Sequence, residues 1–173
     1  MKFSGRIERL GTETAFDVLA VVNKLKAEGR DIISFAIGEP DFDTPSNIKD
    51  AAKQALDDNQ THYNPSNGLP DFREAIVADT MKMRPGFACD IDEVVVTPGA
   101  KPIIFHSLLS IAEPGDEVIY PNPGFPIYES MINFVGAKPV PCPLLESRKF
   151  SIDTDDLARR VSDRTAMIII NSP

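Results

Sequence analysis

The sequence predicts an α/β fold built on a mostly parallel sheet. From residue 93 to residue 170, short apolar runs alternate with helix-like patterns, the order typical of strand–helix–strand units. The runs at 94–96, 117–120 and 166–170 are apolar at nearly every position, as expected of strands buried on both faces. Hydrophobic residues make up 42% of the 173 residues, which is enough for a packed core.

The charge and the cysteine content exclude several functional classes. Lys+Arg number 18 and Asp+Glu 26, so the formal net charge of −8 argues against nucleic-acid binding, which needs clustered basic residues. No apolar run approaches the ~20 residues of a membrane span, and we expect no secretory signal. Cys89 and Cys142, with only His62 and His106 beside them, predict no metal site. Both cysteines are expected to be small buried hydrophobes in a reducing cytoplasm.

The first 60 residues predict two helices and one strand. Apolar residues recur at helical spacing over 12–28, where Thr12 provides an N-terminal cap and Gly29 follows the last turn. A short apolar run over 32–37 predicts a strand that ends in a turn. Helical spacing returns over 46–58 and predicts the second helix.

The remaining elements alternate between helix and strand. Pro70 suits the first turn of a third helix. Further helices are expected over 103–111, 125–134 and 153–161, and strands over 94–96, 117–120, 138–141 and 166–170. Prolines favour an edge position for strand 138–141, whereas strand 166–170 looks central.

The chain stops at Pro173, three residues past the last predicted strand. A complete α/β domain normally continues into a loop and a covering helix, so we expect a truncated sequence. A small four-stranded domain that ends there is the alternative. Ligands of open α/β sheets bind beyond the carboxyl ends of the strands, so a binding site is expected at this end of the sheet.

Two strand-to-helix junctions are candidates for ligand binding. Residues 97–101 follow a strand and open a helix, so their amides would face an anion such as phosphate. The segment matches neither common nucleotide-binding glycine motif, and a tight turn without a ligand is the alternative. Residues 121–128 contain three prolines and present Phe125 and Tyr128, which either stack on a flat ring or belong to the core.

A third candidate comprises the loops 37–42 and 63–65, which are rich in turn residues. Gly38 allows close approach of a ligand because it has no side chain. Tyr63 is either a packing residue or a phosphate donor.

Five segments occur together in an order typical of one enzyme family. They are ISFAIGEPDFDTP (33–45), THYNPSNGLP (61–70), VTPGAK (96–101), GDEVIYP (115–121) and INSP (170–173). They are distributed along the chain from residue 33 to residue 173. In these segments the sequence resembles the class I/II aminotransferases, the aspartate-aminotransferase-like enzymes of fold type I that depend on pyridoxal 5'-phosphate.

The resemblance implies a domain organisation. Residues 1–45 would form an N-terminal arm and a helix of the smaller domain. Residues 46–173 would form the N-terminal part of the large, cofactor-binding domain, which has a mostly parallel sheet and helices on both faces. The resemblance also implies a homodimer, and the composition favours a cytoplasmic location.

The resemblance assigns five residues to the cofactor, pyridoxal 5'-phosphate. Gly99, Ala100 and Lys101 match the loop whose amides hold the phosphate. Phe125 matches the aromatic residue that stacks on the pyridine ring, where many family members have tryptophan. Tyr63 matches a tyrosine that reaches the phosphate of the neighbouring subunit's cofactor.

For the substrate, the resemblance assigns Gly38 to a backbone position near the carboxylate. It implies transfer of an amino group between an amino acid and a 2-oxo acid, by a chain that lacks the family's Schiff-base lysine, its pyridine-pairing aspartate and its carboxylate-binding arginine. Lys101 does not match that lysine, which lies much later in the family, so no catalytic residue is assigned. The alternatives are a lyase or decarboxylase of the same fold, a ligand-sensing regulator built on it, and an unrelated nucleotide-binding module.

Overall fold

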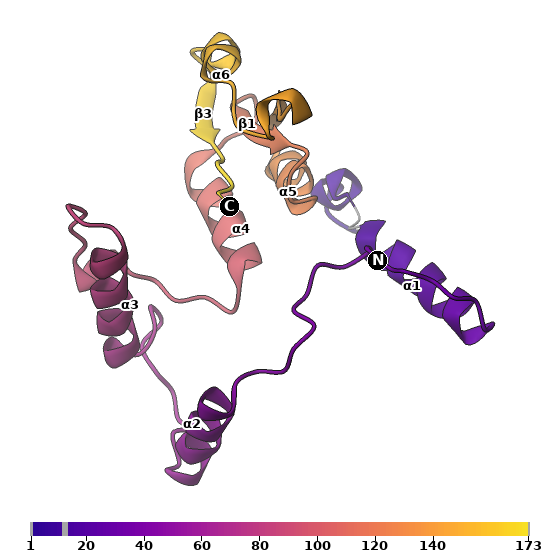
Figure 1. The fold of residues 1–173 in the computed structure, drawn as a ribbon. Coiled ribbons are helices and arrows are strands. Elements are labelled where there is room, and N and C mark those ends of the chain that lie inside the picture. Colours follow the sequence, from indigo (N-terminus) through magenta and orange to yellow (C-terminus); the bar gives the residue numbers. More distant parts are fainter. Residues whose placement is uncertain (1, 12–13, 173) are drawn as a thin grey trace. The chain divides into compact units, whose positions relative to one another are not determined.

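A computed structural model describes residues 2–11 and 14–172 of the chain, with the side chains of residues 14 and 15 left out. The chain divides into two compact units. One consists of the residues up to Ile37 together with those from Gly99 onwards, and the other of Gly38–Pro98 (Figure 1). Each unit is described by itself. The proposed boundary between residues 45 and 46 stays a prediction.

The larger unit contains a parallel three-stranded sheet. Its strands are β1 (Glu117–Asn122), β2 (Lys138–Pro143) and β3 (Thr165–Ile168), in the order β2-β1-β3. The predicted edge position of β2 is confirmed. The prediction that the last strand is central is wrong for this sheet, because β1 lies between the other two. The side chains from Glu117 to Pro121 are buried, which explains the continuous apolar run in β1.

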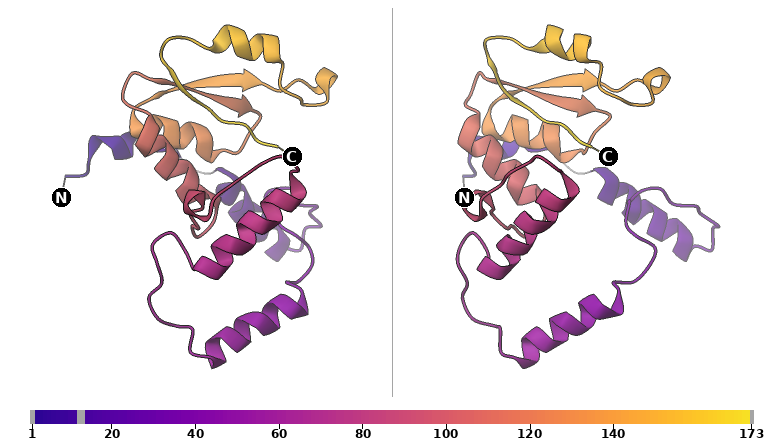
Figure 2. Two further views of the ribbon diagram at one scale, coloured as in Figure 1. Left: turned by 90° about the vertical axis from the view of Figure 1, so that its left-hand side faces the viewer. Right: turned by 60° about the vertical axis from the view of Figure 1, so that its left-hand side comes forward.

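Helices cover both faces of this sheet, as predicted. They are α4 (Ala100–Ile111), α5 (Ile127–Val135) and α6 (Thr154–Arg160). Figure 2 shows α6 on one face and α4 and α5 on the other. The core lies between α4, α5 and β1, where Leu108, Val118 and Ile132 are fully buried.

The N-terminal segment contacts α5. A 3-10 helix, η1 (Gly5–Arg9), places Arg9 so that its guanidinium donates to the carbonyl oxygens of Asn133 and Phe134, at 2.9 and 3.1 Å. These carbonyls belong to the last turn of α5, where a cation is favourable. The helix α1 (Thr14–Ala27) follows, and Gly29 after it has the expected positive φ, 83°. Its predicted cap, Thr12, lies outside the described residues.

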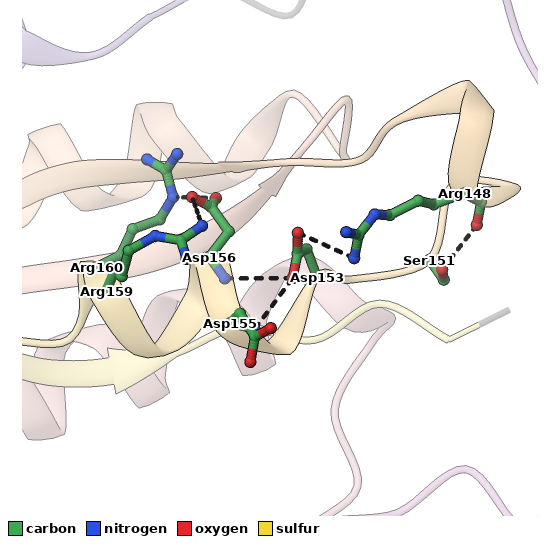
Figure 3. Close-up of polar contacts among 7 residues, drawn as sticks. All are labelled: Arg148, Ser151, Asp153, Asp155, Asp156, Arg159 and Arg160. Atoms are coloured by element: carbon green, nitrogen blue, oxygen red, sulfur yellow. Dashed lines mark hydrogen bonds and ion pairs between the residues drawn. The ribbon is translucent and has the colours of Figure 1, made fainter.

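Acidic residues cap the start of α6. The carboxylate of Asp153 accepts hydrogen bonds from the backbone amides of Asp155 and Asp156, at 3.1 and 3.3 Å (Figure 3). Arg148 is the last residue of the 3-10 helix η3 (Glu146–Arg148). Its guanidinium lies 3.0 Å from the Asp153 carboxylate. Within the helix, Asp156 pairs with Arg160 at 2.6 Å. These contacts explain why such a short, charged segment is helical beside β2.

A buried carboxylate joins the amino ends of all three strands. Glu117 accepts hydrogen bonds from the Ser162 hydroxyl at 2.7 Å, from Lys138 at 2.9 Å and from Arg164 at 3.0 Å. Its side chain is only 7% exposed. The Ser162 hydroxyl bond, followed by those from Lys138 and Arg164, lowers the pKa of Glu117 from 4.5 to about 2, against the opposing effect of burial.

We expect Glu117→Gln to lower the thermal unfolding midpoint at pH 7 by roughly 5–10 °C. Because the folded-state pKa lies below the ordinary value, the carboxylate stabilises the fold above about pH 4.5, and this contribution is lost as the pH falls through about 2. The unfolding midpoints of the variant and the natural chain should therefore approach each other as the pH falls from about 4.5 and converge below about pH 2. Thermal unfolding by circular dichroism across this range tests it. The exposed Glu28→Gln is the control, and an equal loss there would contradict the account.

The smaller unit contains α2 (Ser46–Asp57), α3 (Pro70–Met83) and the 3-10 helix η2 (Ile91–Glu93). The predicted helix over 46–58 and the helical start at Pro70 are confirmed.

One buried arginine of α3 organises this unit. The guanidinium of Arg73, 6% exposed, donates to the carbonyl oxygen of Val94 at 2.9 Å and to that of Ile91. It also pairs with Asp92 at 3.3 Å. These contacts from one buried guanidinium to residues 91–94 hold α3 against the segment that follows η2.

Two predicted strands are wrong for the described residues. Residues 32–37 form no sheet pairing, and Ile33 and Phe35 are 84% and 93% exposed. Residues 94–96 are also not in a strand, because the Val96 amide bonds to the Asn67 carbonyl at 3.0 Å instead of to a neighbouring strand. An apolar run favours burial, but a strand also needs a neighbouring strand to pair its backbone hydrogen-bonding groups.

Candidate cofactor site

The N-terminus of α4 presents backbone amides beside a glycine in a left-handed conformation. Gly99 is the N-cap residue, with φ 93° and ψ 178°. Among the described residues, apart from its chain neighbours, none lies within 4 Å of the position that a Cβ would take there. No acidic residue lies in the first turn of α4. The positive end of the helix is therefore not neutralised by its own carboxylates, which suits an anion.

Lys101, in the first turn of α4, lies close to two aromatic rings. Its Nζ is 5.6 Å from the centroid of Phe16 in α1 and 5.8 Å from that of Phe125. Both distances are within the range of cation–π attraction. The structure thus brings Phe125 to the same place as the α4 N-terminus, as the resemblance implies.

The loop after β1 holds Phe125 at the carboxyl end of the sheet. A Cβ on Gly124 would overlap the carbonyl oxygen of Pro121, so only glycine fits this turn. The peptide bond between Asn122 and Pro123 is cis. Phe125 is 36% exposed. Most of the residue therefore packs against the protein, and about a third of its surface is exposed.

Tyr128 follows in the first turn of α5 and is a core residue, 6% exposed. Its ring meets that of Phe125 edge-on, with centroids 5.8 Å apart and planes at 87°. Its hydroxyl donates to Oδ1 of Asn171 at 2.8 Å. Asn171 comes directly after the last apolar run, so the contact joins the carboxyl ends of β1 and β3.

The sequence leaves open whether Tyr128 stacks on a ligand ring or belongs to the core. The structure places it in the core. Sequence reasoning gives Asn171 no role beyond its place in a motif. Its position as the first polar residue after an apolar strand is the signal that singles it out.

The other two predicted site residues, Gly38 and Tyr63, belong to the smaller unit. Gly38 lies in a loop where no described residue except its chain neighbours comes within 4 Å of a Cβ position. Tyr63 is fully exposed and borders a surface cavity of about 530 Å³ lined by residues 60, 62–64 and 69–72. The two loops belong to a different unit from the start of α4, and the roles of Gly38 and Tyr63 stay predictions.

Comparison with known protein families decides what this architecture belongs to. The sequence pattern of the family described as Aminotransferase class I and II matches residues 30–173. The chain belongs to this family. The aspartate aminotransferase of Pyrococcus horikoshii is 46% identical over 143 residues, covering 83% of this chain and 36% of that protein. The probable aspartate/prephenate aminotransferase of Aquifex aeolicus is 38% identical over 170 residues, covering 98% and 43%.

Solved structures of class I and II aminotransferases show the same fold. The aspartate aminotransferase from Thermus thermophilus with maleate superposes with a TM-score of 0.93 at 33% identity, covering all of this chain and 45% of that one. An alanine aminotransferase from Pyrococcus furiosus gives a TM-score of 0.87 at 30% identity, covering 96% and 43%. The predicted fold type I architecture is therefore confirmed. The chain spans less than half the length of these relatives.

Two kinds of feature are absent from the described residues of this chain. No helix there is long and apolar enough to cross a membrane. Within the same residues, no group of three or more His, Cys, Asp or Glu side chains is placed to hold a metal ion. Cys89 is partly exposed, whereas Cys142 is buried as expected, and burial raises the pKa of the Cys142 thiol.

Proposed function

We propose that this chain carries the phosphate and ring contacts of a pyridoxal 5'-phosphate-dependent aminotransferase that moves an amino group between an amino acid and a 2-oxo acid. The observation that carries the proposal is the α4 N-terminus beside Phe125, at the carboxyl end of β1. The class I and II family membership supports it.

The residues present fit the cofactor. A phosphate group needs convergent amides and no competing carboxylate, and the first turn of α4 has no acidic residue. The backbone of Gly99 has a positive φ, 93°, and carries no side chain that would screen the start of the helix from a ligand. A planar pyridine needs an aromatic face, and Phe125 is exposed enough to offer one.

In this proposal, the candidate site residues bind the cofactor or the substrate. The amides of Gly99, Ala100 and Lys101 hold the phosphate, and Phe125 orients the ring. When bound, the cofactor supplies an electron sink for reactions at the substrate Cα. Gly38 lies near the substrate carboxylate, and Tyr63 reaches the phosphate held by a second copy in a cytoplasmic homodimer. Residues 1–45 belong to the smaller domain and residues 46–173 to the cofactor-binding domain.

The direct test uses the protein expressed from its complete natural gene. It is incubated with pyridoxal phosphate, a panel of amino acids and a 2-oxo acid acceptor, and the products are quantified. We expect a new amino acid and a new 2-oxo acid in equal amounts. Products that show loss of carbon dioxide or of a side-chain group, without amino transfer, would contradict the transaminase assignment and favour a decarboxylase or a lyase.

Phe125→Ala should weaken the binding of pyridoxal phosphate in that protein. Loss of a stacked aromatic pair costs about 0.5–1.5 kcal/mol beyond the lost contact area, so we expect a decrease in affinity of roughly threefold to tenfold or more. A titration followed by visible absorbance measures it.

The matched control is Phe134→Ala. That ring packs against Phe105 with centroids 5.6 Å apart, on the opposite end of α5 from the site. It should lower the stability and leave the cofactor affinity unchanged. An unchanged affinity in Phe125→Ala would remove Phe125 from the site.

A further inference from the structure

Tyr128 contacts both segments that flank the proposed ring site. Its ring packs edge-on against Phe125, which follows β1, at 5.8 Å between centroids. Its hydroxyl donates to Oδ1 of Asn171, which follows β3, at 2.8 Å. One side chain thus connects the carboxyl ends of two adjacent parallel strands, the edge of the sheet where ligands bind.

Both contacts are firmly held. The edge-on geometry, with an interplanar angle of 87°, is a favoured arrangement of aromatic pairs and restricts the tilt of Phe125. The Tyr128 amide also donates to the Phe125 carbonyl at 3.0 Å. The buried hydroxyl remains a neutral donor over the whole physiological range, because burial raises the pKa of Tyr128.

The orientation of the Asn171 amide follows from the same hydrogen bond. Since Oδ1 accepts from the Tyr128 hydroxyl, the amide nitrogen of Asn171 is turned away from Tyr128. The hydroxyl therefore fixes both the position of the segment after β3 and the direction in which its amide points.

We propose that Tyr128 is a positioning residue for the cofactor ring, which sets the tilt of Phe125 and couples it to Asn171 so that the two strand ends stay at a fixed separation. This inference rests on the proposed function. Tyr128 acts through its two neighbours, because its ring is in the core and its hydroxyl is already used by Asn171.

The two contacts can be tested separately. Tyr128→Phe keeps the ring against Phe125 and removes only the hydroxyl. Asn171→Ala removes the acceptor and leaves the tyrosine in place. If the hydrogen bond is the coupling, the double variant should be no worse than either single variant.

The experiment titrates pyridoxal phosphate into the cofactor-free protein from the complete natural gene. Affinity is measured by visible absorbance, and ring orientation by the circular dichroism that a bound chromophore acquires in an asymmetric site. Tyr128→Phe and Asn171→Ala should each lower the affinity roughly threefold to tenfold, the range for one net hydrogen bond, and reduce the induced signal per bound cofactor. The double variant should show the same loss.

Tyr120→Phe is the matched control. Tyr120 is also a nearly buried tyrosine, 8% exposed, and its hydroxyl donates to Glu129 at 3.0 Å. Its loss should lower the unfolding midpoint while leaving the cofactor affinity and the induced signal unchanged. This comparison separates positioning of the ring from general loosening of the core.

Three outcomes would overturn the inference. If Tyr128→Phe binds pyridoxal phosphate like the natural protein with the same induced signal, the positioning role falls and the proposed function stands. If Tyr120→Phe loses as much affinity, the effect is one of general stability. If the natural protein itself does not bind the cofactor, the proposed function and this inference both fall.

Discussion

Replacing Gly99 with valine is expected to lower the affinity for pyridoxal phosphate roughly tenfold to a hundredfold, in the protein from the complete natural gene. The φ of Gly99 is 93°, a region that β-branched residues avoid at a cost of about 1–3 kcal/mol. In the part of the chain that the structure describes, no group beyond the neighbouring residues lies within 4 Å of the added Cβ, so the strain expected there is conformational. The backbone should relax by rotating the amides away from the phosphate. Unphosphorylated pyridoxal should lose much less affinity.

The control for this substitution is Gly115→Val. Gly115 has φ 104° and equally open surroundings, but it lies at the other end of α4. The Gly115→Val protein should lose a similar amount of folding stability without a change in its preference for the phosphorylated cofactor. Equal losses for pyridoxal phosphate and pyridoxal in Gly99→Val would show that this glycine serves folding alone.

A polypeptide of these 173 residues alone is expected to catalyse no transamination. In the family that it resembles, a lysine exchanges the cofactor with the substrate and moves the proton at Cα, and no lysine of this sequence matches it. The residues that would pair with the ring nitrogen and the substrate carboxylate are not matched either. We expect weak cofactor binding at most.

The same polypeptide should also associate. The strand β3 is at an edge of the sheet, and Ile168 and Ile170 are 41% and 65% exposed. An apolar edge of this kind is a template for pairing with other chains. Light scattering at increasing protein concentration measures the association.

Two measurements test the absence of turnover. Borohydride reduction in the presence of pyridoxal phosphate should yield no stoichiometric adduct at a single lysine, by peptide mass spectrometry. Incubation with a panel of amino acids and a 2-oxo acid should yield no new 2-oxo acid. Stoichiometric trapping at Lys101 together with turnover would overturn this prediction and the phosphate-loop assignment of Lys101.

The sequence predicts the helices better than the strands, for a physical reason. The helices α2 and α3 follow from local signals, namely helical spacing and a proline in the first turn. A strand depends on a partner that lies far away in the sequence. The apolar runs over 32–37 and 94–96 carry the same local signal as β1, yet they have no strand partner in the described chain. Nothing in their own residues distinguishes them.

The candidate site shows the same division. The left-handed Gly99 at a helix start could be predicted from the local sequence, because the glycine separates an apolar run from a helix. The contact from Tyr128 to Asn171 could not, since the two residues are 43 positions apart. The burial of Glu117 could not be predicted for a similar reason, because its hydrogen-bond partners lie at or just before the starts of two other strands.

The central claim is that the amides at the start of α4 hold the cofactor phosphate. It is tested most directly by nuclear magnetic resonance on the protein from the complete natural gene, labelled with nitrogen-15 at glycine, alanine and lysine. The account predicts that the amide signals of Gly99, Ala100 and Lys101 shift on addition of pyridoxal phosphate, and remain in place on addition of pyridoxal. Saturable binding of pyridoxal phosphate without a shift of these three amides, or equal shifts with both compounds, would contradict it.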